Sequence, residues 1–350
     1  MPVHGVSFEV DDISVVDERS VKLKLFGKEV IVGNDELERY VLSSYLEAGE
    51  AFQPDSRALQ KLVENALSAA DYELAALALK GLCTRGTDED RLSFIGKLES
   101  KTNAWEFFKY LLSAPELINS NPAVMTALIF YTAGWDVGWV KRHCLRYVYL
   151  FAGRLRALFK EKFYAAMLEG KYTDLDAMVQ SGYALLGAED ETFARLQMIS
   201  NKLKKGLVAI AKGDLEGLLP LKDMGERDSE LGKVLPVVIV SAVKEQMEKC
   251  LLENDAYLAL KVVSLINPEW CTQEILTLTD RAMNGYQPGD NSYLLSVSSY
   301  NFLDNLSARN RAIKRSYLAL LERELLFSLD RGYFENTGAL FNRILLLRPD

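Results

Sequence analysis

The sequence is poor in the residues that most often bind metals or perform catalysis. It has two histidines, His4 and His143, and four scattered cysteines with no C-x-x-C pair. A zinc or di-iron site would therefore lack ligands, and a Ser-His-Asp triad would have to recruit His143 from a helix face. The G-x-S-x-G elbow and both glycine-rich nucleotide fingerprints are also missing. We therefore expect no catalytic motif, no metal and no cofactor.

Long hydrophobic runs are missing as well. The apolar stretches 123–135 and 234–243 are shorter than the roughly 20 residues that cross a bilayer, and no secretory signal opens the chain. We expect no membrane span and a cytoplasmic protein whose cysteines stay reduced in the core. The net charge is −8, whereas non-specific nucleic-acid binding needs a broad excess of Lys and Arg. Nucleic acid is therefore not an expected partner.

What the chain does have is an ordinary globular composition and a sharp change of pattern near residue 33. Apolar residues make up 49% of the chain and charged residues 26%, which allows a large core. Residues 7–32 carry short, alternating β-branched runs, whereas the pattern from Asn34 onward is helical. We predict a mainly α protein with a small β-hairpin element at 1–32 and an α-helical repeat domain at 33–350.

One phrase recurs in the helical part: a helix end, a turn that carries Gly, Asp or Asn, often a Tyr, and a second apolar helix. Gly170, Gly213 or Asn254 can close a helix in the left-handed conformation, and Tyr172 or Tyr257 can then fold back over the corner. The phrase occurs at 66–82, 166–182, 209–225, 250–266 and 327–345. Its later copies are separated by 43 and 41 residues. Helical hairpins at a period of about 40 predict an α-solenoid.

These turns resemble those of a known family. The segments AADYELAALAL, EGKYTDLDAM and AKGDLEGLL are similar to the G-D-Y-x-x-A corner between the helices of tetratricopeptide repeats. The ending LFNRILLLRPD resembles the close of such a repeat. The period departs from the family value of about 34, and the first-helix Trp-Leu-Gly-Tyr pattern is missing. The resemblance implies a divergent solenoid with a curved surface that binds other proteins.

The N-terminal β element suggests a second resemblance. The run VKLKLFGKEVIV, followed by an acidic helical segment, looks like the start of some phage tail-assembly proteins. This resemblance implies a viral structural or tail-assembly factor as an alternative function. Because a small sheet exposes unpaired strand edges, we also expect these strands to pair with another copy of the chain or with a partner.

Residues 137–170 carry the longest helical pattern, a proline-free run that predicts one helix roughly 50 Å long. Apolar residues such as Val140, Cys144 and Val148 recur at steps of three and four and predict a buried seam. A basic stripe lies on the opposite side of this helix. The residues predicted to bind a partner there are Arg142, Arg146, Tyr149, Arg156 and Lys160.

The basic stripe has two interpretations. It can be a solvated helix face, or it can line a groove for an acidic peptide, a phosphate-bearing ligand or nucleic acid. We favour an acidic peptide, or another protein that carries one, because solenoids present concave protein-binding surfaces and the negative chain repels polyanions.

Acidic clusters are the remaining candidates for chemistry. The clusters at 88–90, 189–191 and 226–228 lie at predicted helix starts, where acids stabilise the helix dipole. Aromatic residues such as Trp105 and Phe108 have spacing typical of a core. Two classes of function therefore remain, a non-enzymatic interaction scaffold or adaptor and an all-helical enzyme with dispersed catalytic carboxylates. The lack of any local motif favours the scaffold.

Overall fold

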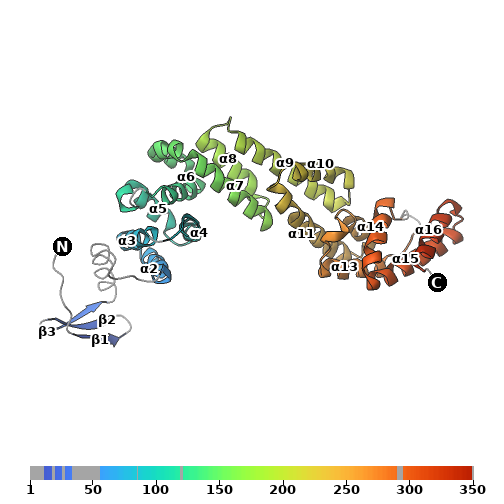
Figure 1. The fold of residues 1–350 in the computed structure, drawn as a ribbon, viewed down its shortest axis with the longest axis horizontal. Coiled ribbons are helices and arrows are strands. Elements are labelled where there is room, and N and C mark those ends of the chain that lie inside the picture. The colour runs from blue at the N-terminus through green and yellow to red at the C-terminus, as the bar shows by residue number, and fades with distance from the viewer. Residues whose placement is uncertain are drawn as a thin grey trace. The chain divides into compact units, whose positions relative to one another are not determined.

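The structure, a computed structural model, describes residues 12–17, 20–25, 28–33, 56–84, 86–118, 121–289 and 295–348. Fifteen α-helices occupy most of these residues, so the mainly α class predicted from the sequence is confirmed (Figure 1). The chain forms two compact units, which are described one at a time. The first comprises residues 1–159 and 181–188, and the second comprises residues 160–180 and 189–350.

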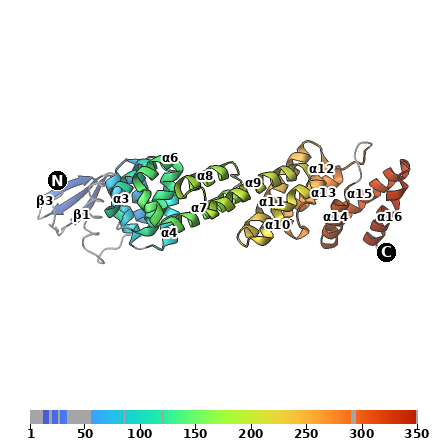
Figure 2. The same cartoon turned by 90° about the horizontal axis from the view of Figure 1, so that it is seen from above.

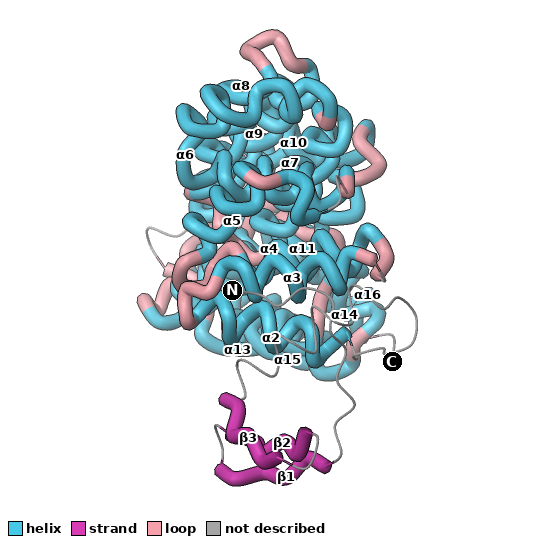
Figure 3. The backbone as a smooth tube through the Cα atoms, turned by 90° about the vertical axis from the view of Figure 1, so that its left-hand side faces the viewer, coloured by secondary structure: helices cyan, strands magenta, loops and turns pink. Residues whose placement is uncertain are grey.

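Three short strands lie in the N-terminal region for which the sequence predicts β structure. They are β1 (Asp12–Asp17), β2 (Ser20–Leu25) and β3 (Lys28–Gly33), shown in magenta in Figure 3. The strands form an antiparallel sheet in the order β1-β2-β3, in which Val21 faces Val15 on one side and Val32 on the other. The helix predicted at 35–48 lies outside the described residues.

The first unit is built mainly from helices that pack on α6. α2 and α3 form a hairpin, while α4 and α5 pack against α6. Gly96 permits the close approach of α4, because a Cβ atom there would lie 2.5 Å from the hydroxyl oxygen of Tyr131 on α6. The helices of this unit are α2 (Ser56–Ser68), α3 (Tyr72–Cys83), α4 (Asp88–Leu98), α5 (Ala104–Ser113), the 3-10 helix η2 (Pro115–Ile118) and α6 (Pro122–Leu150).

The N-terminal half of α6 is the core of the first unit. Every residue from Ala123 to Ala133 is buried, and Phe107 and Phe108 of α5 are fully buried as well. Each such large side chain contributes about 1.5–3 kcal/mol through the apolar surface that it removes from water. Among the described helices, α6 has the length and hydropathy that a membrane span requires, but 67% of its most apolar window is buried inside the protein. This burial is typical of a core helix.

The second unit is a succession of helical hairpins. α9 packs against α10, α11 against α12, and the two hairpins contact each other through α10 and α11; α13 then packs on α12 and α15 (Figure 2). α7 (Ala152–Leu168) and α8 (Asp174–Leu186) each belong partly to both units. The other helices are α9 (Glu191–Lys212), α10 (Leu215–Arg227), α11 (Leu231–Leu252), α12 (Ala256–Val263), the 3-10 helix η3 (Pro268–Trp270), α13 (Gln273–Gly285), α14 (Val297–Arg309), α15 (Arg311–Asp330) and α16 (Phe334–Leu347).

The five recurring turns share one backbone geometry. Each contains a single residue with φ between 57° and 74°, and these residues are Ala70, Gly170, Gly213, Asn254 and Gly332. In each turn the next N–H donates to the carbonyl five residues earlier at 2.8–2.9 Å, which is the Schellman closure of a helix. The pairs are Asp71 and Ala66, Lys171 and Ala166, Asp214 and Ala209, Asp255 and Cys250, and Tyr333 and Ser328. The sequence predicts the left-handed conformation for Gly170, Gly213 and Asn254, and this prediction is confirmed at all three.

Three of these turns also start the next helix with the same residue type. Asp71, Asp214 and Asp255 each accept a hydrogen bond from the N–H three residues later, so one residue ends a helix and caps the following one. The tyrosines that follow the turns are less buried than expected. Tyr172 and Tyr257 are half-buried, and the ring of Tyr257 stacks on Tyr286 at the end of α13 with ring centres 6.4 Å apart; Tyr333 is 52% exposed.

Candidate functional site

The basic stripe begins after a break inside α6. Asp136 has φ −152° and ψ 87°, which is not helical, and its Oδ1 accepts a hydrogen bond from the N–H of Trp139 at 2.8 Å. The second half of the helix therefore starts with its own capping residue. Val140, Cys144 and Val148 are buried, so the predicted seam of this segment is confirmed.

The single helix predicted over 137–170 is wrong. α6 ends at Leu150, and α7 begins at Ala152. Between them, Phe151 has φ −108° and ψ 16°, and its N–H still donates to the carbonyl of Tyr147. The buried seam continues beyond the break with Leu155. Phe151 leaves the helical region of φ and ψ but keeps this hydrogen bond. The helix therefore breaks, while the three- and four-residue spacing of its buried apolar side chains continues.

The structure divides the predicted partner-binding residues between exposed and paired positions. Arg142, Arg146 and Tyr149 are exposed on α6, at steps of four and three that place them on one face. Arg156 is half-buried on α7. Lys160 belongs to the second unit and forms an ion pair with Glu230. The candidate site is therefore the part of the stripe that α6 presents.

The charged residues in this part of the chain are all basic. Residues 137–160 contain six Lys and Arg residues and no Asp or Glu, although the whole chain has a net charge of −8. Within the described part of the chain, neither Arg142 nor Arg146 has an ion-pair partner. Arg154 of α7 lies 3.8 Å from Asp88 of α4. The two unpaired guanidinium groups thus remain available to an external carboxylate.

A cluster of aromatic residues adjoins the stripe, and it was not predicted from the sequence. The ring centre of Trp105 on α5 lies 5.8 Å from that of Trp135 and 5.6 Å from that of Trp139, both on α6. The ring of His143 lies 4.9 Å from Trp139. Trp135 is 41% exposed, and His143 is exposed. We call Trp105, Trp135, Trp139 and His143 the tryptophan cluster. Its sequence signal is the spacing of four residues between the aromatic residues of α6.

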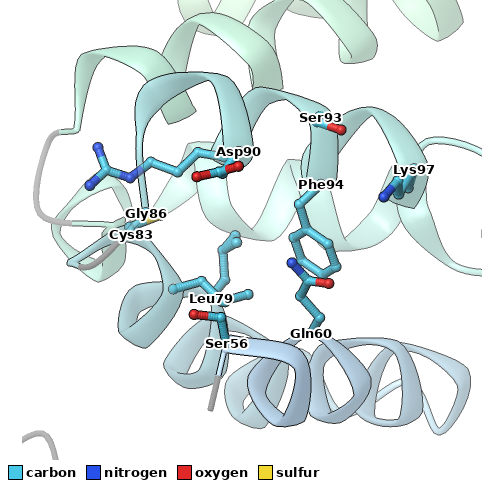
Figure 4. A pocket seen from close by; sticks show the side chains of 11 residues that line it. Ser56, Gln60, Leu79, Cys83, Gly86, Asp90, Ser93, Phe94 and Lys97 are labelled. Carbon is cyan, nitrogen blue, oxygen red and sulfur yellow. The ribbon is translucent and has the colours of Figure 1, made fainter. Parts of the chain in front are cut away.

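A cavity of about 280 Å³ lies between α2, α3 and α4 in the first unit. Ser56 and Gln60 of α2 and Phe94 of α4 lie around it in Figure 4. Burial raises the pKa of the Cys83 thiol to about 12, although Arg91 opposes this shift. The thiol is therefore protonated near neutral pH and is a weak nucleophile.

The acidic clusters act mainly as helix caps. Asp90 completes a capping box with Thr87 at the start of α4, and Asp190 caps α9. Asp228 accepts hydrogen bonds from the N–H groups of Glu230 and Leu231 and pairs with Arg195. Burial alone would raise the pKa of Asp228, but these bonds hold it below its ordinary value. The described residues contain no group of three or more His, Cys, Asp or Glu that could hold a metal ion.

One buried carboxylate was also not predicted from the sequence. Glu324 on α15 is fully buried and accepts hydrogen bonds from the hydroxyls of Tyr286 at 3.0 Å and Tyr300 at 2.7 Å. Burial raises the pKa of Glu324, whereas these hydrogen bonds oppose the shift. The sequence signal is its position in α15, four residues after Leu320 on the apolar face. The carboxylate has its hydrogen bonds satisfied inside the fold, which is typical of a structural role.

Comparison of the chain with models of known protein families, with curated proteins and with solved structures gives no match. The geometry of the chain itself therefore provides the argument for its function.

Proposed function

We propose that the protein is a non-enzymatic interaction protein that binds an acidic segment of a partner protein along the second half of α6. The observation that carries this proposal is the exposure of Arg142 and Arg146 on one face, with no ion-pair partner in the described part of the chain. A protein of net charge −8 has many carboxylates that could pair with two exposed arginines. Leaving both of them unpaired favours recognition of a carboxylate on another molecule.

We also propose that the hairpins stack as an α-solenoid. The support is the common Schellman geometry of the five turns and the successive contacts of α9, α10, α11, α12 and α13 within the second unit. Each hairpin in such an array buries its apolar face against its neighbours, which leaves helix faces available for binding. The divergent resemblance to tetratricopeptide repeats agrees with this arrangement.

The test is binding of a defined acidic probe. A fluorescein-labelled peptide of alternating Glu and Gly should bind the wild-type protein, with an anisotropy signal that declines as salt is raised, because exposed charges are screened over about 8 Å at physiological ionic strength. Reversal of both Arg142→Glu and Arg146→Glu should weaken binding at least about tenfold, equivalent to about 1.4 kcal/mol. Circular dichroism should remain unchanged, since both side chains are exposed.

The matched control is the double variant Lys205→Glu and Lys233→Glu. Both lysines are exposed residues of the second unit and do not belong to the stripe, and this variant changes the net charge by the same amount. It separates a local site from the general effect of charge. Equal weakening by the two double variants would show that the peptide senses only net charge, and the proposed site would then be wrong.

The other predicted functions stay predictions. β1 and β3 each have one paired side in the three-stranded sheet, so strand pairing with another copy or with a partner remains an expectation. A viral structural or tail-assembly factor remains an alternative function. An enzyme with dispersed carboxylates also remains an alternative. The cytoplasmic location expected from the sequence also stays a prediction.

A further inference from the structure

The tryptophan cluster gathers three of the four tryptophans of the chain at the break in α6. The cluster is only partly covered. Phe108 stacks beneath Trp135 with ring centres 6.3 Å apart, yet Trp135 is still 41% exposed, and Trp105 and Trp139 are half-buried. Solvent therefore reaches a surface made of several indole rings.

Partly exposed indole rings offer a large apolar surface on which a partner can pack. Tryptophan, tyrosine and arginine are the residues most enriched at the energetic centres of protein interfaces, where a large ring fills or forms a pocket. The rings here meet at tilted and edge-on angles of 54° and 74°. At such angles the cluster presents both ring faces and ring edges, the two surfaces to which another aromatic ring packs.

The unpaired arginines adjoin the cluster along α6. Arg142 follows Trp139 by three residues and Arg146 follows His143 by three, so each arginine lies one helical turn beyond an aromatic residue. Lys109 lies over the ring of Trp105 at 5.1 Å and pairs with Glu106 at 2.7 Å.

Two acidic side chains near this surface have partners inside the protein. Asp136 uses its carboxylate to cap the N–H of Trp139, and Glu106 is paired with Lys109. The surface therefore presents aromatic rings at one end and unpaired positive charge at the other, which is complementary to a segment that carries carboxylates beside an aromatic side chain.

We propose that the acidic segment carries an aromatic side chain, Phe, Tyr or Trp, which docks on the tryptophan cluster while the neighbouring carboxylates of the segment pair with Arg142 and Arg146. This inference rests on the proposed function and specifies its partner. The aromatic ring supplies the apolar part of the recognition, and the arginines fix the direction in which the segment lies along α6.

Two probes separate the two contributions. One is the labelled peptide of alternating Glu and Gly, and the other is the same peptide with one central Gly replaced by Phe. The Phe peptide should bind about tenfold more tightly, because aromatic packing adds to apolar burial. Trp135→Ala should remove this advantage without changing the affinity of the first peptide. The matched control is Trp270→Ala, which removes a half-buried tryptophan on η3, outside the cluster.

A second measurement does not depend on a variant that weakens the cluster. In a Trp270→Phe background, all remaining tryptophan fluorescence comes from the cluster. A Glu-rich peptide that carries 4-iodophenylalanine should quench this fluorescence by contact, whereas the same peptide with plain Phe should not. Saturating binding of the iodinated peptide with no quenching would overturn the inference.

The outcomes distinguish this inference from the proposed function. If the two peptides bind with equal affinity, and reversal of Arg142 and Arg146 abolishes the binding of both, the aromatic anchor is overturned and the acidic site stays in place. No binding of either peptide would overturn both. Binding to phosphatidylserine vesicles that depends on Trp135, with no preference between the peptides, would assign the cluster to a lipid surface and would also overturn the inference.

Discussion

The carboxylate of Asp136 accepts a hydrogen bond from the backbone N–H of Trp139, with 2.8 Å between Oδ1 and N. A helix start leaves backbone N–H groups without partners, and this bond satisfies one of them at the break in α6. The break therefore costs less than an uncapped interruption would. Trp135 lies before the break and Trp139 after it, and both contact Trp105.

Replacing Asp136 with Ala should lower the free energy of unfolding by about 1 kcal/mol, because the cap is lost. Thermal denaturation followed by circular dichroism measures this loss. The N–H of Trp139 donates the capping hydrogen bond, so the emission spectrum of the tryptophans should also change. Asp136→Asn is the control, since Asn caps helices as well as Asp does. If both variants lose the same stability, the charge of Asp136 matters and its capping bond does not.

The left-handed turns predict a graded response to alanine. Gly170 has φ +74° and open space where an added methyl group would lie, so Gly170→Ala should cost about 1–2 kcal/mol through backbone strain alone. Gly213 has φ +62°, and a Cβ atom there would lie 2.9 Å from the Cβ of Lys261, so Gly213→Ala should cost more. The two midpoints of thermal denaturation give the comparison. Equal losses would mean that α12 moves aside without cost.

The reverse substitution tests the same geometry with the opposite sign. Ala70 already adopts φ 57° in the first of the five turns, so Ala70→Gly should raise the free energy of unfolding by up to about 1 kcal/mol as the strain is relieved. A lower denaturation midpoint for this variant would show that unfolded-chain entropy outweighs the strain at this turn.

Glu324 predicts a dependence of stability on pH. Because burial raises its pKa above the ordinary value of 4.5, the folded protein keeps this proton at pH values where the unfolded chain has lost it. The stabilisation is complete below the ordinary pKa and is lost as pH rises through the raised one. Glu324→Gln should remove this dependence while it still accepts from one tyrosine hydroxyl and donates to the other. The stability of the variant minus that of the wild type should therefore be larger at neutral pH than at acidic pH.

Melting temperatures measured between about pH 4 and pH 8 test this prediction. The control is Glu245→Gln, which removes a carboxylate on α11 outside the buried tyrosine network and should shift the curve little at any pH. A parallel pair of curves for wild type and Glu324→Gln would show that folding does not raise the pKa of Glu324.

Features of the fold that depend on near neighbours were the ones predicted from the sequence. Gly170 and Gly213 indicate left-handed helix ends because glycine has no Cβ, and both adopt that conformation. Ala70 adopts it too, but alanine carries no such signal, since packing of α2 on α3 imposes the turn there. The sequence has no proline or capping residue before Phe151, so its apolar periodicity predicts a helix that continues through the break.

The candidate site divides in the same way. The exposure of Arg142 and Arg146 follows from their position opposite the seam, which the sequence predicts. The ion pair of Lys160 with Glu230 joins α7 to the turn before α11, and the two residues are far apart in the chain, so no local pattern indicates it. The tryptophan cluster needs α5 beside α6, and this packing is a tertiary contact.

The Schellman turns have a consequence for how the chain is made. Each turn closes with a hydrogen bond between residues five apart, and each of the hairpins α9–α10 and α11–α12 packs mainly against its neighbour in sequence. Structures dominated by short-range contacts fold quickly, because little loop entropy is lost before the contacts form. We expect a growing chain to complete each of these hairpins soon after its second helix leaves the ribosome, so that every finished hairpin is a template on which the next one packs.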